Sequence, residues 1–199
     1  MKIVIVGGVA VGATTATRLR RLSEENEIVI FEKGPYISFA NCGLPYHIGG
    51  IIENREDLLL QTPQKMHGRF NLDIRVKSEV IAINREEKTV TIRRVDNDYT
   101  YTESYDKLIL APGARPIVPP IPGLQQATNL FTLRDVPDTD TPMDIARRYR
   151  TPLVFCNHMR HAPLHIGNSR IVDKEGHVLA QAGPNSDEVI CAEVELAEH

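Results

Sequence analysis

Cys42 is the residue of this chain whose type and surroundings are most typical of redox chemistry. It lies in the run Ser38–Tyr46 (SFANCGLPY), shortly after an opening segment with the pattern of a dinucleotide site. A cysteine reacts as its thiolate, so a reactive thiol needs help to ionise, either from a short helix beginning near Asn41 or from a bound cofactor. Most free cysteines are small buried apolar residues, so the residue type alone leaves a structural role open.

The opening segment supplies the elements of a dinucleotide site. An apolar run at 2–6 is followed by the glycine turn Gly7–Gly12 and by a segment, 10–23, whose apolar residues recur at helical spacing. Glycine lets the backbone turn tightly, and the N-terminus of the helix presents free N–H groups and a positive dipole end to a pyrophosphate. Val9 stands where the usual motif has its middle glycine. The alternative is a β-α-β core with a glycine turn and no ligand.

Glu32 favours the nucleotide site over that alternative. It ends a second apolar strand at 27–32, where a carboxylate can accept hydrogen bonds from ribose hydroxyls. Strand, turn, helix and acid together therefore predict that a dinucleotide is held by Gly7, Gly8, Gly12 and Glu32.

The order of apolar segments predicts an α/β fold. The strands at 2–6 and 27–32, with the helix between them, imply a parallel pair with a right-handed crossover. Thr62 and Pro63 begin a further helix as its cap and first residue. An antiparallel strand insertion and a returning buried strand are then expected at 73–76, 79–84, 89–93, 99–102 and 106–110.

The character of the chain changes after residue 135. We predict one domain at 1–135, a linker at 136–142 and a small α+β segment at 143–199. The elements expected in this last segment are a helix at 143–149, a strand at 153–156, a hairpin at 169–180 and a last strand at 188–194.

Composition excludes several classes of protein. The net charge of −3 over 199 residues does not favour binding to nucleic acid. No apolar stretch reaches the roughly 18 residues that a membrane span needs, and no signal-peptide pattern opens the chain. The cysteines Cys42, Cys156 and Cys191 are few and far apart, which predicts a reducing, cytoplasmic setting.

Three segments together resemble the flavin-dependent pyridine nucleotide-disulfide oxidoreductases: Gly7–Gly12, Phe31–Lys33 and Ser38–Tyr46. The branch that they resemble comprises the single-cysteine coenzyme A-disulfide reductases with their NADH oxidase and polysulfide reductase relatives. Valine at the position of Val9 is normal in that branch. Tyr105–Arg115 is similar to the strand and turn by which the family returns to the flavin. The resemblance covers about residues 1–135.

The resemblance implies a Rossmann-like FAD-binding domain and a redox cycle. Hydride would pass from NAD(P)H to the flavin, and electrons would then reach a mixed disulfide on Cys42, which would lie near the flavin ring; a sulfenic acid is the alternative oxidised form. The glycines of the turn would lie at the pyrophosphate, and Glu32 at the adenosine ribose. The further cofactor-binding residues that it implies are Lys33, Ala111 and Gly113.

The substrate implied by this branch is a small-molecule thiol or disulfide such as coenzyme A, which is polyanionic. Thr14, Arg18 and Arg21 are spaced by four and three residues, so they share one face of the first helix, while Arg20 points elsewhere. Their positions match those that coenzyme A-disulfide reductases use, although a solvated basic face fits the spacing alone equally well. Ser38 and Asn41 flank the thiol and are expected to orient the substrate.

The chain shows no second nucleotide fingerprint, so it shows no NAD(P)H site. After Gly123 its glycines, at positions 167, 176 and 183, are isolated. Residues of about 142–195 instead resemble the C-terminal part of carbon–nitrogen hydrolases, without that family's catalytic residues. We read the chain as a join of two incomplete pieces, natural or artefactual. Apolar surface left uncovered by missing domains would promote self-association.

Three hypotheses of function follow. The first is a flavin-linked disulfide reductase, the second a truncated or chimeric FAD-binding fragment without turnover, and the third a carbon–nitrogen hydrolase remnant. A zinc site at Cys156, His158, His161 and His165 has suitable spacing. These residues lie on an expected strand and loop that do not make ligands converge, so no metal is predicted.

Overall fold

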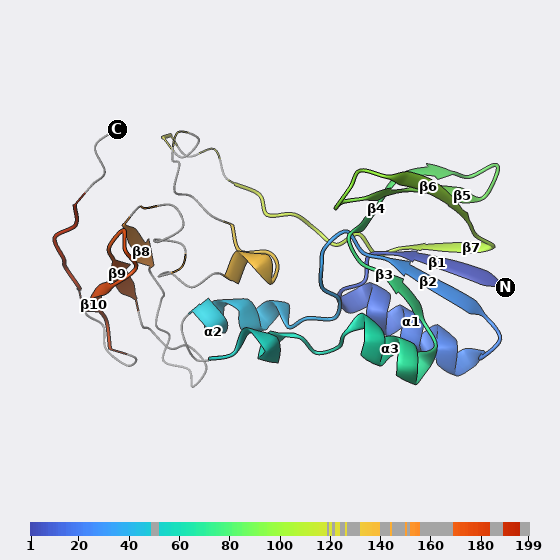
Figure 1. Ribbon diagram of the computed structural model, residues 1–199, viewed down its shortest axis with the longest axis horizontal. Coiled ribbons are helices and arrows are strands. Elements are labelled where there is room, and N and C mark those ends of the chain that lie inside the picture. Colours follow the sequence, from blue (N-terminus) through green and yellow to red (C-terminus); the bar gives the residue numbers. More distant parts are fainter. Residues whose placement is uncertain are drawn as a thin grey trace. The chain divides into compact units, whose positions relative to one another are not determined.

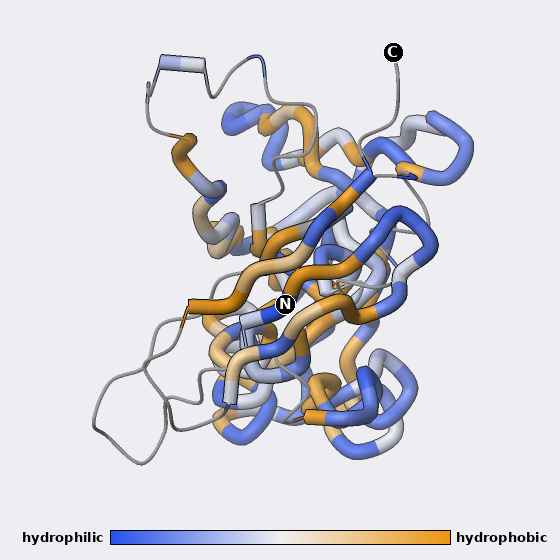
Figure 2. Tube along the Cα trace, turned by 90° about the vertical axis from the view of Figure 1, so that its left-hand side faces the viewer, coloured by the Kyte–Doolittle hydropathy of each residue, from blue (hydrophilic) through white to orange (hydrophobic). Residues whose placement is uncertain are grey.

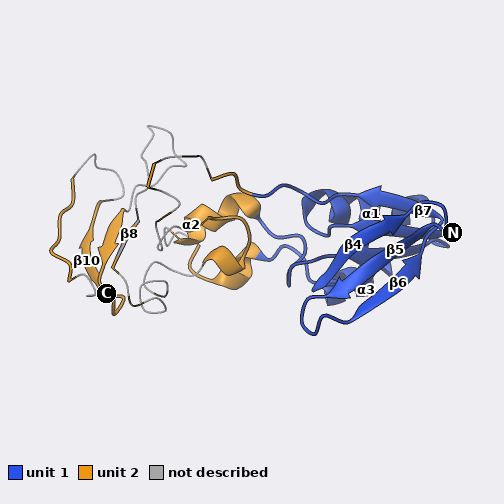
Figure 3. Cartoon of the chain, turned by 90° about the horizontal axis from the view of Figure 1, so that it is seen from above, with its two compact units in different colours: residues 1–40, 59–115 blue, residues 41–58, 116–199 orange. Residues whose placement is uncertain are grey.

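The computed structural model describes residues 1–48, 52–118, 120, 122–123, 126, 132–139, 144, 150, 152–155, 169–183 and 189–195. The chain divides into two compact units (Figure 3). Unit 1 comprises residues 1–40 and 59–115, and unit 2 comprises residues 41–58 and 116–199.

Unit 1 is built on a four-stranded parallel sheet, which confirms the predicted Rossmann-like α/β fold (Figure 1). Its order is β3-β2-β1-β7, with bounds Asp73–Arg75, Glu27–Phe31, Lys2–Val6 and Lys107–Leu110. Helix α1 (Ala10–Leu22) connects β1 to β2, and α3 (Pro63–Phe70) precedes β3. Along the chain, hydrophobic stretches alternate with hydrophilic ones (Figure 2).

Side chains on both faces of β1 and β2 are buried, which explains why these strands are continuously apolar. On one face Ile3 and Ile5 join a core with Ala13 and Ala16 of α1. On the other face Val4 joins a second core that an antiparallel sheet completes. That sheet has the order β4-β5-β6, with bounds Ser78–Asn84, Thr89–Arg94 and Thr100–Ser104.

Ion pairs join the two sheets of unit 1. The Glu103 carboxylate on β6 receives Lys2 Nζ of β1 and an Arg75 guanidinium nitrogen of β3, each at 2.6 Å. Because these groups are partly shielded from water, they are worth more than fully exposed pairs. The antiparallel insertion that the sequence predicts is therefore tied to the parallel sheet by charge as well as by apolar packing.

Helices α1 and α3 are held together by Arg20, which is buried. Its side chain donates to the carbonyl oxygens of Phe70 at 2.8 Å, Asn71 at 2.9 Å and Glu24 at 2.6 Å. The start of α3 confirms the sequence prediction, because the Thr62 hydroxyl accepts from Lys65 N–H at 3.3 Å and Pro63 follows.

Unit 2 contains short helices and a small antiparallel sheet. The 3-10 helix η1 (Asn41–Gly43) runs into α2 (Leu44–Ile48), and the 3-10 helices η2 (Arg55–Leu58) and η4 (Pro137–Thr139) follow. The sheet has the order β10-β9-β8, with bounds Val178–Gln181, Arg170–Val172 and Leu153–Phe155.

The predicted hairpin of unit 2 is confirmed, with its turn at Lys174–Gly176. The predicted helix at 143–149 lies, except for residue 144, outside the described residues. The predicted last strand is wrong over its described part, since 189–195 contains no strand. A strand needs a neighbour for its backbone, and among the described residues β8, β9 and β10 pair only with one another.

In the part of the chain that the structure describes, no helix is both long and apolar enough to cross a membrane.

The predicted domain boundary at residue 135 cuts the chain once, whereas each compact unit is made of two segments that are separate in the sequence. It stays a prediction.

Candidate functional site

The turn between β1 and α1 has no room for side chains at two of its glycines. Gly7 adopts a φ of 97°, and a Cβ there would overlap the carbonyl oxygen of Ala111. A Cβ at Gly12 would overlap the carbonyl oxygen of Gly7. At Gly8 a Cβ would press on Ile37 Cγ2 at 3.0 Å. The glycines therefore let β1, α1 and the segment after β7 approach closely.

The N-terminus of α1 is left without a side-chain cap. Its N-cap residue is Val9, which makes no side-chain capping hydrogen bond, and the first turn contains no acidic residue. Free N–H groups and a positive dipole end, with no acidic residue in the first turn of the helix itself, suit an anion such as a pyrophosphate. The residues present therefore fit the phosphate part of a dinucleotide.

Glu32 lies against this turn, as the sequence predicts for a ribose acceptor. Its Oε2 accepts from the N–H of Gly8 and its Oε1 from the N–H of Gly34, both at 2.7 Å. An ionised carboxylate has about four acceptor positions, so two hydrogen bonds leave capacity for ribose hydroxyls. The backbone contacts fix the orientation in which Glu32 would receive them.

The other cofactor-binding candidates of unit 1 differ in what they contact. Lys33 pairs with Glu79 at 2.8 Å, and hydrogen bonds from Lys33 and then Arg93 lower the pKa of the Glu79 carboxyl. Lys33 is thus directed to the antiparallel sheet. Ala111 donates its N–H to the Val6 carbonyl at 2.8 Å, and Gly113 adopts a φ of 70°.

The predicted substrate face of α1 is exposed at Thr14, Arg18 and Arg21, while Arg20 is buried. The structure adds two residues from α3 that the sequence reasoning missed. The Arg21 guanidinium lies 6.0 Å from the centre of the Phe70 ring, and that of Arg69 lies 5.1 Å from it. No pattern within either helix signals this cluster, because it depends on how α1 and α3 pack.

Cys42 is an exposed free cysteine in the 3-10 helix η1, which confirms the expected short helix near Asn41. Asn41 is exposed beside it. Both belong to unit 2, whereas Ser38 belongs to unit 1. Ser38 has a φ of 45°, its N–H donates to the Gly8 carbonyl at 3.3 Å and its own carbonyl accepts from Leu60 at 3.0 Å. The Ser38 backbone is thus tied to the glycine turn.

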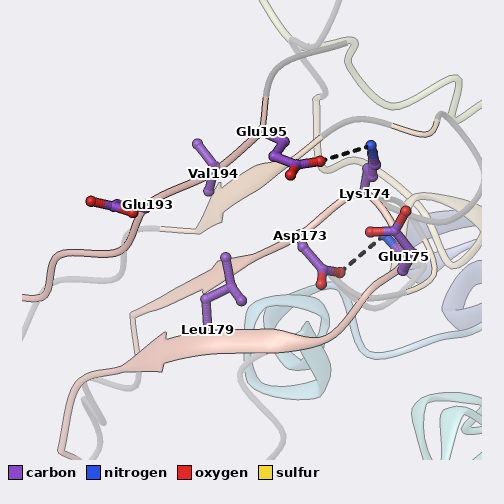
Figure 4. Close-up of a pocket in the computed structure, with 7 residues that line it drawn as sticks. All are labelled: Asp173, Lys174, Glu175, Leu179, Glu193, Val194 and Glu195. Carbon is purple, nitrogen blue, oxygen red and sulfur yellow. Dashed lines mark hydrogen bonds and ion pairs between the residues drawn. The ribbon is translucent and has the colours of Figure 1, made fainter.

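Unit 2 contains a pocket of about 290 Å³ beside the hairpin (Figure 4). Its lining is Asp173, Lys174, Glu175, Leu179, Glu193, Val194 and Glu195. The lysine pairs with Glu195 at 3.4 Å, and the Asp173 carboxylate accepts from the backbone of Glu175 and His177. Such a negative lining would repel a polyanionic substrate, and the aspartate already serves the turn.

Metal chemistry receives no support from the described residues, which contain no group of three or more potential ligands. Cys156, His158, His161 and His165, the alternative zinc set, lie outside the described residues.

The structure shows a glycine turn closed by backbone contacts, an acidic residue after the second strand and a short helix with an exposed cysteine, which are the features by which the sequence resembles the disulfide reductases. Residues 1–148 match the family described as pyridine nucleotide-disulphide oxidoreductase. The chain belongs to this family.

Its relatives include coenzyme A disulfide reductases. Those of Staphylococcus aureus and Staphylococcus epidermidis are 47% and 45% identical over 140 and 141 residues, which is 70% of this chain and 31% of theirs. The chain thus spans about a third of the length of these relatives.

Solved structures show the same kinship. The reduced Bacillus anthracis protein described as CoADR-RHD has 67% identity and a TM-score of 0.67, covering 70% of this chain and 25% of its own. An NAD-dependent persulfide reductase from A. fulgidus has 34% identity and a TM-score of 0.65, covering 70% and 26%. The family resemblance is confirmed, whereas the resemblance of 142–195 to carbon–nitrogen hydrolases gains no support here and stays a prediction.

Proposed function

We propose that this chain is the FAD-binding part of a reductase that acts on coenzyme A disulfide or a related persulfide through Cys42, with NAD(P)H as the electron donor. The observation that carries the proposal is the glycine turn with Glu32 bonded to it, in a chain 47% identical to coenzyme A disulfide reductases over its matched part.

The proposed FAD site uses residues of unit 1. Gly7, Gly8, Gly12 and the first turn of α1 would hold the pyrophosphate, and Glu32 would accept from the adenosine ribose. Ala111 and Gly113 would contribute backbone groups, and Lys33 would have to leave Glu79 to contribute its charge. Bound FAD would supply two-electron chemistry that the protein's side chains lack.

The role proposed for Cys42 is thiol–disulfide exchange. Its thiolate attacks one sulfur of coenzyme A disulfide, the substrate S–S bond breaks, a Cys42–coenzyme A mixed disulfide forms and one coenzyme A thiolate leaves. The cysteine sulfur is oxidised and the departing sulfur is reduced, so the exchange itself balances. Exposure of Cys42 gives the substrate access. Ser38 and Asn41 flank the thiol and are proposed to orient the substrate.

The substrate's phosphates are proposed to bind the face of α1 formed by Thr14, Arg18 and Arg21. Arg69 extends this positive surface onto α3, and Phe70 offers an aromatic ring near both the Arg21 and the Arg69 guanidinium groups. Arginine binds phosphates bidentately, and a nucleobase stacks on aromatic rings, so the cluster suits the nucleotide end of coenzyme A.

The proposal is tested by the absorption spectrum of the purified full chain. We expect a yellow protein that holds FAD and, once its thiols are reduced and its flavin is oxidised, rapidly releases coenzyme A thiol from coenzyme A disulfide. A Cys42→Ser variant should keep the colour and lose the rapid release, leaving at most the slower exchange of Cys191. A colourless protein that does not take up added FAD would refute the proposal.

Anaerobic NADH separates this function from the second candidate. The observation that favours a fragment without turnover is that the 199 residues contain a single nucleotide fingerprint. Bleaching of the flavin by NADH would support the reductase, whereas bound flavin that NADH leaves oxidised would support the fragment.

Self-association is proposed as well, because Ile117 is 90% exposed and Leu110 58% exposed. A constant monomer mass across a dilution series would contradict it.

A further inference from the structure

The helical segment that carries Cys42 is too short to be stable alone. It comprises η1 and α2, which together span Asn41–Ile48, whereas isolated helices shorter than about 12–15 residues are marginal in water. Its buried face presents Leu44, His47 and Ile48. Within the described part of unit 2, α2 packs against η2 and η4. The position of the thiol therefore depends on these two neighbours.

The segment 134–139, which contains η4, has a shape fixed by its own side chains. The Asp138 carboxylate accepts from the backbone N–H of Arg134 at 2.7 Å and of Asp135 at 3.0 Å. The Thr139 hydroxyl donates to the Val136 carbonyl at 2.6 Å, and the Val136 and Thr139 side chains are each 1% exposed. We name this segment the brace, because its locally fixed turn puts buried side chains against α2.

Arg55 connects the brace to the elements that follow the thiol helix. Its Nη2 donates to the Val136 carbonyl at 2.8 Å, across 81 residues of sequence. Residue 52 ties the same stretch to α2, because Ile52 N–H donates to the Tyr46 carbonyl at 3.3 Å and the Ile52 carbonyl lies 2.7 Å from His47 Nδ1. Hydrogen bonds thus tie residue 52 to α2 and, three residues further along the chain, tie Arg55 to the brace.

We propose that Arg55 is a positioning residue, which holds the brace 134–139 against α2 and so fixes the Cys42 thiol for exchange with a bound disulfide. The inference rests on the proposed function of Cys42. A guanidinium suits this task because it is always charged and its planar donors are preorganised. The main-chain carbonyl that it binds is also used by Thr139, so losing Arg55 loosens the brace without removing its internal turn.

The test compares Arg55→Met, Arg55→Gln and Arg55→Lys in the full chain. Methionine keeps length and apolar packing but cannot donate, while glutamine and lysine each keep a donor for Val136. Peptide-level mass spectrometry follows the reaction of Cys42 with coenzyme A disulfide and, separately, with iodoacetamide. Cys191 is also exposed, lies in unit 2 and belongs to no helix, so it serves as an internal control in every sample.

We expect Arg55→Met to slow the reaction of Cys42 with coenzyme A disulfide about tenfold, the effect of losing one charge-assisted hydrogen bond. Its reaction with iodoacetamide and both reactions of Cys191 should stay within twofold. Arg55→Lys should restore most of the rate, and Arg55→Gln part of it. The proposal is overturned if Arg55→Met reacts normally with coenzyme A disulfide, if both reagents slow equally at Cys42, or if lysine does not rescue.

Hydrogen exchange separates this proposal from the proposed function. If wild-type Cys42 reacts with coenzyme A disulfide no faster than Cys191 does, the reductase function is contradicted. The brace is then judged by the amides of 44–48. Faster exchange there in Arg55→Met, with unchanged exchange in β1 and β2, supports the brace, and unchanged exchange at 44–48 overturns it as well.

Discussion

Neighbouring arginines on α1 should separate stability from substrate binding. Arg20 is buried and donates to the carbonyl oxygens of Phe70, Asn71 and Glu24, whereas Arg21 is exposed and contacts the Phe70 ring. We expect Arg20→Met to destabilise the protein and Arg21→Met to leave its stability nearly unchanged. The two substitutions have the same chemistry and adjacent positions, so each controls for the other.

The magnitude for Arg20 follows from its contacts. A hydrogen bond from a charged donor contributes about 1.5–3 kcal/mol, and a buried carbonyl left unpaired adds its desolvation cost. Asn71 and Glu24 are exposed, so water can replace the guanidinium at their carbonyls, and the three contributions do not add in full. We expect a loss of about 2–4 kcal/mol, which would lower Tm by roughly 10–20 °C for a unit of this size.

Far-UV circular dichroism during heating measures the stability, and calorimetric titration with coenzyme A measures the binding. Arg20→Lys should recover only part of the loss, since one ammonium group cannot serve three separate carbonyls. Arg21→Met should weaken coenzyme A binding a few-fold at unchanged Tm. A Tm of Arg20→Met within about 3 °C of the wild type, or an equal loss in Arg21→Met, would refute the reasoning.

Three further predictions follow. Burial opposes ionisation of Glu103, but hydrogen bonds from Lys2 and Arg75 outweigh burial and lower the pKa of its carboxyl. The stability that this carboxylate contributes is present above its pKa in the unfolded chain. It is lost as pH falls through its pKa in the folded protein. The unfolding free energy should thus drop as pH falls below the ordinary glutamate pKa of about 4.5. Glu103→Gln should flatten this dependence in urea titrations, whereas an unchanged slope would contradict it. Gly7→Ala should abolish FAD retention and destabilise unit 1, because a Cβ overlaps a carbonyl oxygen and φ is positive; a variant that stays yellow at wild-type Tm would disprove the tight turn. Phe70→Leu should weaken coenzyme A binding about tenfold and leave pantetheine binding unchanged. Phe70→Tyr is the control that keeps stacking. If Phe70→Leu binds coenzyme A as tightly as the wild type does, stacking on this ring is excluded.

Features encoded by neighbouring residues could be predicted from the sequence. The runs at 2–6 and 27–31 are apolar on both faces because both faces are buried, and this pattern is readable without a structure. Thr62 and Pro63 specify the start of α3 through a local hydrogen bond and a fixed φ. The strand expected at 188–194 is wrong over its described part because strand pairing is not local, and a run of apolar residues does not provide a partner.

The site was predictable to the same extent and for the same reason. Gly7, Gly12 and Glu32 carry their signal in the order strand, turn, helix and acid, and the backbone contacts of the structure account for it. The contact proposed to position Cys42 left no such signal, because Arg55 and the Val136 carbonyl lie 81 residues apart. A hydrogen bond to a main-chain carbonyl makes no demand on the side chain of Val136, so only the arginine could have been informative.

Arg20 shows how packing decides what a charged residue does. A run of basic residues on α1 looks like one cationic surface, yet successive helical residues are rotated by about 100°, so Arg20 faces away from Arg18 and Arg21. The sequence alone indicates that difference in direction. It does not indicate that the C-terminal carbonyls of α3, 50 residues later, are what receives the Arg20 side chain. Because Arg20 fixes the backbone of Phe70, whose ring Arg21 contacts, the buried arginine shapes the surface on which the exposed one is proposed to bind phosphate.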